Sequence, residues 1–316
     1  MKIFIFGEAM LEYHSHGGDG FRYGGDTINT AVHLARAGYD VAYVTAVGMD
    51  AISDRLVAEW SSEGIDTSHV LRHPGRTLGI YAIHLDEHGE RDFLYWRDQS
   101  AARQMFDLPG IQSAIHTASA AHMLYFSLIS LAIVDEIGRD RLLALAAARK
   151  AGGRHVAYDS NFRPRLWPNA VVARKTSEAA IRSATIGFPT ETDERRLYND
   201  QRSDAEIATA WQKLGSEQVV VKAGERGCFL AERPGSLQHF SAPPAAVLDT
   251  TGAGDAFNAG FLAGILEGRE CVDGVRSGQA MAKAALGRLG AIGPRSPAVL
   301  ETGGRCESWS GQFDTD

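Results

Sequence analysis

Short hydrophobic runs alternate along the chain with stretches of helical periodicity. The runs are nearly continuous and rich in β-branched and aromatic residues, which is typical of strands buried on both faces of a sheet. They are KIFIFG, VAYVTAVG, AHMLYFSLIS, GRHVAYDSN, ATIGFP and QVVVKAG. Between the first two, TINTAVHLARAG has the apolar spacing of a helix. This alternation predicts an α/β fold with a doubly wound, mostly parallel sheet and helices on both faces. Ligands of such sheets bind at the carboxyl ends of the strands.

Residues 79–97, GIYAIHLDEHGERDFLYWR, depart from this rhythm. Two alternating strands flank turn residues from Asp86 to Gly89, which predicts a β-hairpin. Because the hairpin interrupts the alternation of helix and strand, we expect it to leave the main sheet. With residues 9–23 it would form a small sheet that covers the site. The alternative is a hairpin that extends the edge of the main sheet.

No repeat or low-complexity linker divides the chain. We therefore expect a single domain over residues 1–300, with lid segments at about residues 9–23 and 76–100. The polar, Gly- and Ser-rich residues 301–316 are typical of a flexible tail.

The stretch from Leu108 to Val134 contains no Asp, Glu, Lys or Arg and is long enough to span a membrane. Its apolar residues are concentrated in HMLYFSLISLAIV, so we predict a buried strand there rather than a membrane helix.

Composition and charge narrow the class of protein. Of 316 residues, 44% are hydrophobic and 22% charged, as in soluble globular proteins. The net charge of −7 makes nucleic acid and acidic membranes poor partners. Three widely spaced cysteines favour a reducing cytoplasm and argue against structural zinc. The first apolar run is too short for a signal peptide, so we expect a cytoplasmic protein.

Residues 249–264, DTTGAGDAFNAGFLAG, form the most informative motif. Gly252 and Gly254 allow tight backbone conformations, and Ala253 adds little side chain. A helical run follows, so the amides of this loop would converge at a helix N-terminus, which attracts anions. Asp255 lies in the first turn of that helix. An acid there also stabilises the helix end by about 0.3–1 kcal/mol, which is the simpler explanation.

Two signatures together resemble a known family. GAGDAF is not the GxGxxG of dinucleotide-binding folds, and no GxxxxGK[ST] occurs. Instead, DTTGAGDAFNAGFLAG resembles the C-terminal signature of the ribokinase-like (PfkB) carbohydrate kinases. GGDTINTAVHLARAG, residues 24–38, resembles their N-terminal signature. The resemblance covers about residues 2–295 and implies a ribokinase-like fold with a β-sheet lid, ATP as phosphoryl donor, and Mg2+.

For the motif, the resemblance implies specific roles. Asp255 would be the catalytic base that accepts the proton of the sugar hydroxyl. The amides of Gly252, Ala253 and Gly254 would form an anion hole for the transferring phosphoryl group. Because a helix N-terminus lowers the pKa of an acid, we expect Asp255 mainly to orient the hydroxyl.

The N-terminal signature supplies candidates for sugar binding. Asp26 precedes a helical pattern and has the position of a standard N-cap. The resemblance instead places Gly25, Asp26 and Asn29 on the sugar hydroxyls. Both interpretations of Asp26 stay open.

YDSNFRPRLW, residues 158–167, indicates an anionic substrate. In extended chain, alternate residues share a face, so Asp159, Asn161 and Arg163 would project together. The alternative is that Arg163 and Arg165 form surface salt bridges. By resemblance, Asn161 and Arg163 lie between substrate and phosphates.

The predicted hairpin carries a matching feature. Phe93, Tyr95 and Arg97 share one face, and Tyr81 projects from the partner strand. An arginine fork grips a planar carboxylate, which a neutral sugar lacks. YWR and DSNFRPRLW resemble the branch of the family that acts on the sugar acid 2-keto-3-deoxygluconate. That resemblance places Tyr81, Tyr95 and Arg97 on the sugar acid, with Arg97 on its carboxylate.

The nucleotide and cation sites are assigned by resemblance alone. VVVKAGERGC resembles the stretch that contacts ATP in the family, although a plain hairpin turn would also explain its glycines. FPTETDE stands where relatives carry the magnesium motif NxxE, with Thr190 and Asp193 aligned to its ends. The implied residues are Lys222, Gly224 and Gly227 for ATP, Asp193 and Glu194 for Mg2+ through water, and Asp249 and Thr251 for K+.

We therefore expect an ATP-dependent kinase of the terminal hydroxyl of 2-keto-3-deoxygluconate. Two alternatives remain: a fructokinase or ribokinase-type kinase of a neutral sugar, and a non-catalytic sensor of sugar acids. An exposed lid sheet would also allow a homodimer.

Overall fold

The computed structural model describes residues 1–14, 22–85 and 91–294. The predicted turn at residues 86–89 and the predicted tail at residues 301–316 lie outside the described residues.

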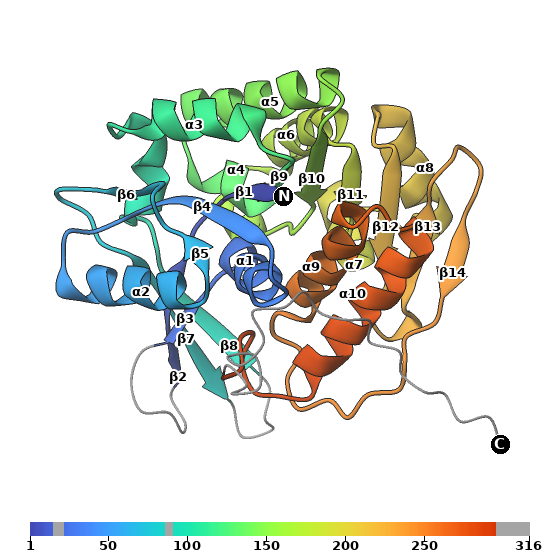
Figure 1. The fold of residues 1–316 in the computed structure, drawn as a ribbon. Helices are drawn as coiled ribbons and strands as arrows, with labels where there is room; N and C mark the ends of the chain where they lie inside the picture. The colour runs from blue at the N-terminus through green and yellow to red at the C-terminus, as the bar shows by residue number, and fades with distance from the viewer. Residues whose placement is uncertain (15–21, 86–90, 295–316) are drawn as a thin grey trace.

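The main sheet has ten strands in the described part of the chain (Figure 1). Its order is β14-β13-β12-β11-β10-β9-β1-β4-β5, with β6 also paired to β4. All pairs from β12 to β5 are parallel, whereas β12 with β13 and β13 with β14 are antiparallel. The strands are β1 (Lys2–Phe6), β4 (Asp40–Val47), β5 (Ile65–Asp66), β6 (Val70–Arg72), β9 (Met123–Ser127), β10 (His155–Asp159), β11 (Ile186–Phe188), β12 (Gln218–Lys222), β13 (Cys228–Ala231) and β14 (Gln238–Phe240).

Helices cover both faces of this sheet (Figure 1). They are α1 (Asp26–Arg36), α2 (Ala51–Ser62), α3 (Ile111–Ala120), α4 (Leu128–Ile133), α5 (Glu136–Ala151), α6 (Ala170–Ser183), α7 (Glu191–Tyr198), α8 (Asp204–Leu214), α9 (Ala253–Leu266) and α10 (Cys271–Leu286). Short 3₁₀ helices occupy Ala101–Asp107, Pro164–Leu166 and Gly224–Arg226.

Two hydrophobic cores lie against opposite faces of the sheet. Alternate residues of β1 belong to different cores: Phe4 and Phe6 pack with α3, α4, α5, α6 and α8, whereas Ile3 and Ile5 pack with α1, α2, α9 and α10. This burial on both faces explains the continuous apolar runs of the sequence. The predicted α/β class and mostly parallel sheet are confirmed.

A second, smaller sheet has the order β3-β2-β7-β8 and stands apart from the main sheet (Figure 1). Its strands are β2 (Met10–His14), β3 (Arg22–Gly24), β7 (Gly79–Leu85) and β8 (Arg91–Trp96). β7 and β8 form the predicted antiparallel hairpin, with Tyr81 opposite Tyr95. β2 joins this hairpin in parallel through β7. The alternative of a hairpin on the edge of the main sheet is therefore wrong.

The prediction of one buried strand in the uncharged stretch from Leu108 to Val134 was too simple. The strand is only β9, and the stretch also contains α3 and α4. α4 begins directly after β9 because Ser127 and Ser130 form a capping box: the hydroxyl of each pairs with the backbone N–H of the other, at 3.2 and 3.1 Å. Within the described residues, each helix is too short or too polar to cross a membrane.

The parallel strands deliver polar residues to one edge. Asp159 ends β10 and lies in register with Ser127 at the end of β9 and Phe188 at the end of β11. Lys222 ends β12. The predicted site residues of distant segments therefore meet at the carboxyl edge of the sheet, beneath the small sheet.

Candidate active site

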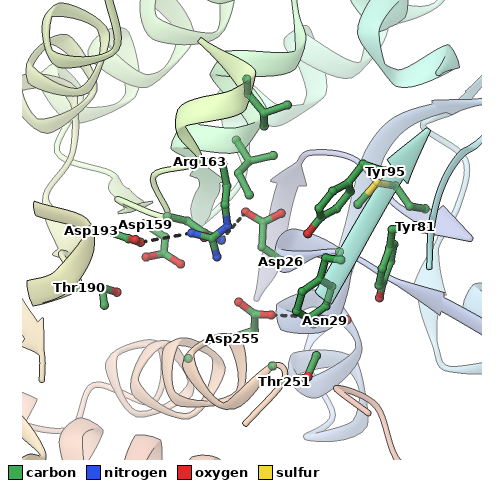
Figure 2. Close-up of a pocket in the computed structure, with 18 of the residues that line it drawn as sticks. Asp26, Asn29, Tyr81, Tyr95, Asp159, Arg163, Thr190, Asp193, Thr251 and Asp255 are labelled. Atoms are coloured by element: carbon green, nitrogen blue, oxygen red, sulfur yellow. Dashed lines mark hydrogen bonds and ion pairs between the residues drawn. The ribbon is translucent and has the colours of Figure 1, made fainter. Parts of the chain in front are cut away.

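A pocket of about 1380 Å3 opens at this edge (Figure 2). Pockets for one drug-sized ligand measure roughly 300–1,000 Å3, so this pocket has room for two small ligands. The predicted residues that line it are Gly25, Asp26, Asn29, Tyr81, Tyr95, Arg97, Asn161, Arg163, Asp193, Lys222, Asp249, Thr251, Gly252, Gly254 and Asp255. The predicted residues outside its lining are Glu194, Gly224, Gly227 and Ala253.

Asp255 lies near the middle of the pocket. In Figure 2, Tyr81 and Tyr95 lie toward one end and Thr190 and Asp193 toward the other, with Asp255 between them. Its carboxylate accepts a hydrogen bond from Asn29 Nδ2 at 2.8 Å. Asp255 is thus placed where two ligands, one at each end, would meet.

The predicted lowering of the Asp255 pKa by the helix N-terminus is wrong. Burial, and then the charges of Asp26 and Asp159, raise the pKa of Asp255 to about 8. Asn29 and Lys222 lower it by smaller amounts. Loss of hydration and two like charges outweigh the helix dipole, so Asp255 is a stronger base than its position on the helix predicts.

The carboxylates of Asp26, Asp159 and Asp255 lie close together in the pocket (Figure 2). Each accepts a hydrogen bond from an asparagine amide. These pairs are Asn29 with Asp255 at 2.8 Å, Asn161 with Asp26 at 3.0 Å, and Asn258 with Asp159 at 3.0 Å. Burial and the nearby charge of Asp159 also raise the pKa of Asp26. The neutral amides hold Asp26 and Asp255 without cancelling their charges, whereas Asp159 also forms an ion pair with Lys222 at 3.0 Å.

The prediction that Asp26 caps α1 is wrong. Gly25 is the N-cap, with φ of 146°, and as a glycine it has no side chain that could cap the helix. Asp26 is the first helical residue, and its carboxylate reaches Asn161 in the pocket. Gly25 is needed because of its φ and because a Cβ there would lie 2.4 Å from the carbonyl oxygen of Glu8.

The loop before α9 supplies fewer free amides than predicted. The Ala253 N–H donates to the Thr250 carbonyl at 3.3 Å. Gly252 and Gly254 line the pocket, whereas Ala253 does not. The amides left to face a ligand are therefore those of the glycines and not that of Ala253.

Arg97 lies in the pocket wall but already has a partner. It is 6% exposed and forms an ion pair with Glu8, which is 1% exposed. Glu8 Oε1 and Arg97 Nε have no hydrogen-bond partner among the described residues. The pair therefore retains an unused acceptor and an unused donor in the wall of the pocket.

The aromatic residues of the hairpin form a stack beside Arg97. Tyr95 lies 6.0 Å from Tyr81 and 6.3 Å from Phe93 between ring centroids. The Tyr81 hydroxyl donates to Glu12, so its hydrogen is used, while its oxygen can still accept a hydrogen bond.

Sequence reasoning missed Glu8 and Glu12. Both are buried, at 1% and 2% exposure, and each holds a predicted substrate residue of the hairpin. The signal was present in FGEAMLEY, where two acids stand within an apolar strand region, because buried acids need specific partners.

Of the two predicted magnesium residues, only Asp193 reaches the pocket. Its carboxylate accepts from the Phe162 N–H at 3.1 Å and lies 3.5 Å from Arg163 Nη1. Glu194 is buried away from the pocket, and burial raises its pKa to about 7.

The described residues contain no cluster of three His, Cys, Asp or Glu side chains that would enclose a metal. Mg2+ in kinases is commonly held by one or two carboxylates together with phosphates and water, so Asp193 fits the ion without such a cluster.

The other predicted residues divide into two groups. Lys222 lies in the pocket, whereas Gly224 and Gly227 form the turn between the antiparallel β12 and β13, as the hairpin alternative predicted.

Asp249 accepts from the backbone N–H groups of Thr251 and Gly290, each at 2.7 Å. Asp249 therefore ties the loop before α9 to the segment after α10.

The chain matches known sugar kinases over nearly its full length. The family model described as pfkB family carbohydrate kinase matches residues 12–298. The 2-dehydro-3-deoxygluconokinase of Escherichia coli strain K12 is 38% identical over 304 residues, which cover 93% of this chain and 97% of that relative.

Solved structures share the fold. The 2-dehydro-3-deoxygluconokinase of Thermotoga maritima has a TM-score of 0.81 at 22% identity and covers 92% of this chain and 94% of its own. An Escherichia coli protein named as a ribokinase II, in complex with ATP and Mg2+, has a TM-score of 0.78 at 20% identity with the same coverage. These structures show that the fold is ribokinase-like.

Proposed function

The chain belongs to the pfkB family of carbohydrate kinases, and on this basis we propose that it phosphorylates 2-keto-3-deoxygluconate, also called 2-dehydro-3-deoxygluconate. The phosphoryl group of ATP would pass to the terminal hydroxyl of this sugar acid. The relative that is 38% identical over nearly the whole chain carries the name of this activity.

The observation that carries the sugar-acid specificity is the placement of Arg97. It lies in the pocket wall beside the aromatic stack, and its Nε has no partner among the described residues. A substrate carboxylate would satisfy this buried donor, whereas a neutral sugar would leave it without a charged acceptor. Because Glu8 neutralises part of the charge of Arg97, the pair binds the carboxylate without an excess of positive charge.

Asp255 would act as the base. The proposed hydroxyl lies between the stack and the Gly252 and Gly254 amides, within reach of the Asp255 carboxylate. With a pKa of about 8, Asp255 holds a proton firmly once it has accepted it from the hydroxyl. Asn29 fixes the orientation of the carboxylate, and the glycine amides stabilise the negative charge of the transferring phosphoryl group.

The opposite end of the pocket would hold ATP and Mg2+. The Escherichia coli neighbour in complex with both ligands supports this assignment. Lys222 and Arg163 are the cations of this end, and Asp193 is the carboxylate that would hold Mg2+ through water. When bound, the ion neutralises charge on the phosphates.

A coupled assay of ADP release tests the proposal on a panel of acceptors. The panel contains 2-keto-3-deoxygluconate, its galactonate epimer, gluconate, fructose and ribose. We expect 2-keto-3-deoxygluconate to have the highest kcat/KM and the product to carry phosphate on its terminal oxygen. Faster turnover of fructose or ribose would replace the proposal by a neutral-sugar kinase.

A further inference from the structure

Asn258 is a fully buried polar residue of α9 that no step described so far uses. It stands three residues after Asp255 and therefore on the same side of the helix, one turn further from the anion-binding loop. A buried amide in an otherwise apolar helix interior is costly unless its hydrogen bonds are made. Its partners therefore indicate what it is for.

The hydrogen bonds of Asn258 join α9 to three strands of the main sheet, β9, β10 and β12. Asn258 Nδ2 donates to Asp159 Oδ2 and to the Tyr125 hydroxyl, each at 3.0 Å. Asn258 Oδ1 accepts from Lys222 Nζ at 3.2 Å. The orientation of the amide is fixed by chemistry, because the lysine ammonium only donates and the Asp159 carboxylate only accepts.

Lys222 completes a closed triangle with these two residues. Its Nζ also donates to Asp159 Oδ1, at 3.0 Å. An ammonium has three N–H groups, so two are used by Asn258 and Asp159 and the third remains for the pocket that Lys222 lines. The side chain is 13% exposed, and its long stem is thereby held in one position.

The ammonium lies beside the first turn of α9. A Cβ on Gly254 would stand 3.6 Å from Lys222 Nζ. The charge of Lys222 also lowers the pKa of Asp255, which shows that the two groups interact. One cation thus lies close to Gly254 of the proposed anion hole and interacts with the proposed base.

We propose that Asn258 is a positioning residue for phosphoryl transfer, acting through Lys222. Asn258 and Asp159 together hold the Lys222 ammonium, so that the third N–H of the ammonium points at the phosphoryl group that is being transferred. A flexible lysine would otherwise have to be ordered during each reaction, whereas a fixed one stabilises developing charge without reorganisation. The proposal rests on the proposed function only in that a phosphoryl group is transferred in this pocket.

A double-mutant cycle on kcat tests this role. The variants are Lys222→Met, Asn258→Leu, and both together. We expect Lys222→Met to lower kcat by about 100-fold to 1,000-fold, as for loss of one transition-state donor. Asn258→Leu should lower kcat by roughly 10-fold or more, with the KM for the sugar changed less than about 2-fold. In the Lys222→Met background, Asn258→Leu should then change kcat by less than about 2-fold.

Tyr125→Phe is the matched control. It removes the other partner of the Asn258 amide in the same buried region but leaves the triangle of Asn258, Asp159 and Lys222 intact. We expect it to lower kcat by less than about 3-fold. If Asn258→Leu does not fold, Asn258→Ala replaces it, because a methyl group can neither accept from Lys222 nor donate to Asp159.

Two results would overturn the inference. One is a loss from the Asn258 substitution that multiplies with that of Lys222→Met, which would make the two residues independent. The other is a Tyr125→Phe loss as large as that of Asn258→Leu, which would make the role structural. The cycle is run with whichever acceptor the panel shows to be turned over fastest, so a wrong sugar assignment does not affect it.

Discussion

The chemistry assigned to the pocket depends on the protonation and placement of single side chains. Asp255 is the clearest case, because its local sequence and its surroundings push its pKa in opposite directions. Helix position alone would make it a weak base, and burial beside Asp26 and Asp159 makes it a stronger one. The residues that surround Asp255 are therefore as important to the mechanism as the motif that contains it.

Replacing Asp255 by Asn removes the proton acceptor and keeps the size of the side chain. We expect Asp255→Asn to lower kcat by about 1,000-fold or more, as for loss of a general base, while the sugar still binds. Steady-state turnover and calorimetric titration of the sugar acid check the two parts. Activity within about 10-fold of the wild type would contradict the assignment, and an inactive wild type that binds the sugar acid would indicate a sensor.

The raised pKa of Asp255 also predicts the pH dependence of kcat/KM. A base must be ionised, so activity should fall as the pH drops below the pKa of about 8 in the free enzyme. The profile should therefore rise from pH 6, reach half of its plateau near pH 8 and level off above about pH 9. A profile that is already flat at pH 6 would show that Asp255 is ionised there and that its surroundings do not raise its pKa as described.

Arg97 and Glu8 must be tested together. Removing Arg97 alone leaves a buried, unpaired carboxylate, which would destabilise the fold and obscure the effect on binding. We expect the double variant Arg97→Leu with Glu8→Gln to raise the KM for the sugar acid by about 10-fold to 100-fold and the KM for ATP by less than about 3-fold. Equal changes in both KM values would mean that Arg97 does not bind the carboxylate.

At the scale of elements, the start of α9 makes different demands on two glycines, the N-cap Gly252 and Gly254 in the first turn. Gly252 has φ of 74°, and a Cβ there would lie 2.5 Å from Ala291 Cβ. Gly254 has no such φ, and its nearest neighbour would be Lys222 Nζ at 3.6 Å.

These glycines therefore give a matched pair of substitutions. Gly252→Ala should destabilise the protein by about 2 kcal/mol or more, from backbone strain and overpacking. Gly254→Ala should leave the free energy of unfolding within about 1 kcal/mol of wild type and should lower kcat instead. Urea unfolding and turnover of both variants separate the two effects, and similar loss of stability in both would contradict this reading of the loop.

Much of the architecture was predictable because its signals are local and periodic. The parallel strands, α1, α9 and the lid hairpin follow from apolar periodicity and turn residues. α4 was missed because its capping box begins on the last residue of a strand, where the apolar run continues without a break.

The site was less predictable than the fold. The predicted pocket-lining residues were found through the two signatures and four other short motifs, but their partners come from distant segments. Glu8, Glu12 and Asn258 contact site residues more than 30 positions away. No spacing rule connects residues so far apart, and the pKa of Asp255 depends on the same long-range contacts.

At the scale of the whole molecule, the two sheets contribute different residues to the pocket. The main sheet supplies Asp159 and Lys222 from the ends of its strands, α1 and α9 supply Asp26 and Asp255, and the small sheet supplies Tyr81 and Tyr95. The pocket between them has the volume for two ligands and places Asp255 between its ends (Figure 2). This arrangement suits transfer between two bound molecules rather than hydrolysis of one.

The central claim is that the enzyme selects its sugar by the carboxylate. The most direct test compares kcat/KM for 2-keto-3-deoxygluconate with that for 3-deoxyfructose, in which a hydroxymethyl group replaces the carboxylate and the rest of the molecule is unchanged. We expect the sugar acid to be preferred by about 100-fold, the loss anticipated when a buried arginine is denied its charged partner. Equal values of kcat/KM for the two sugars would contradict the account.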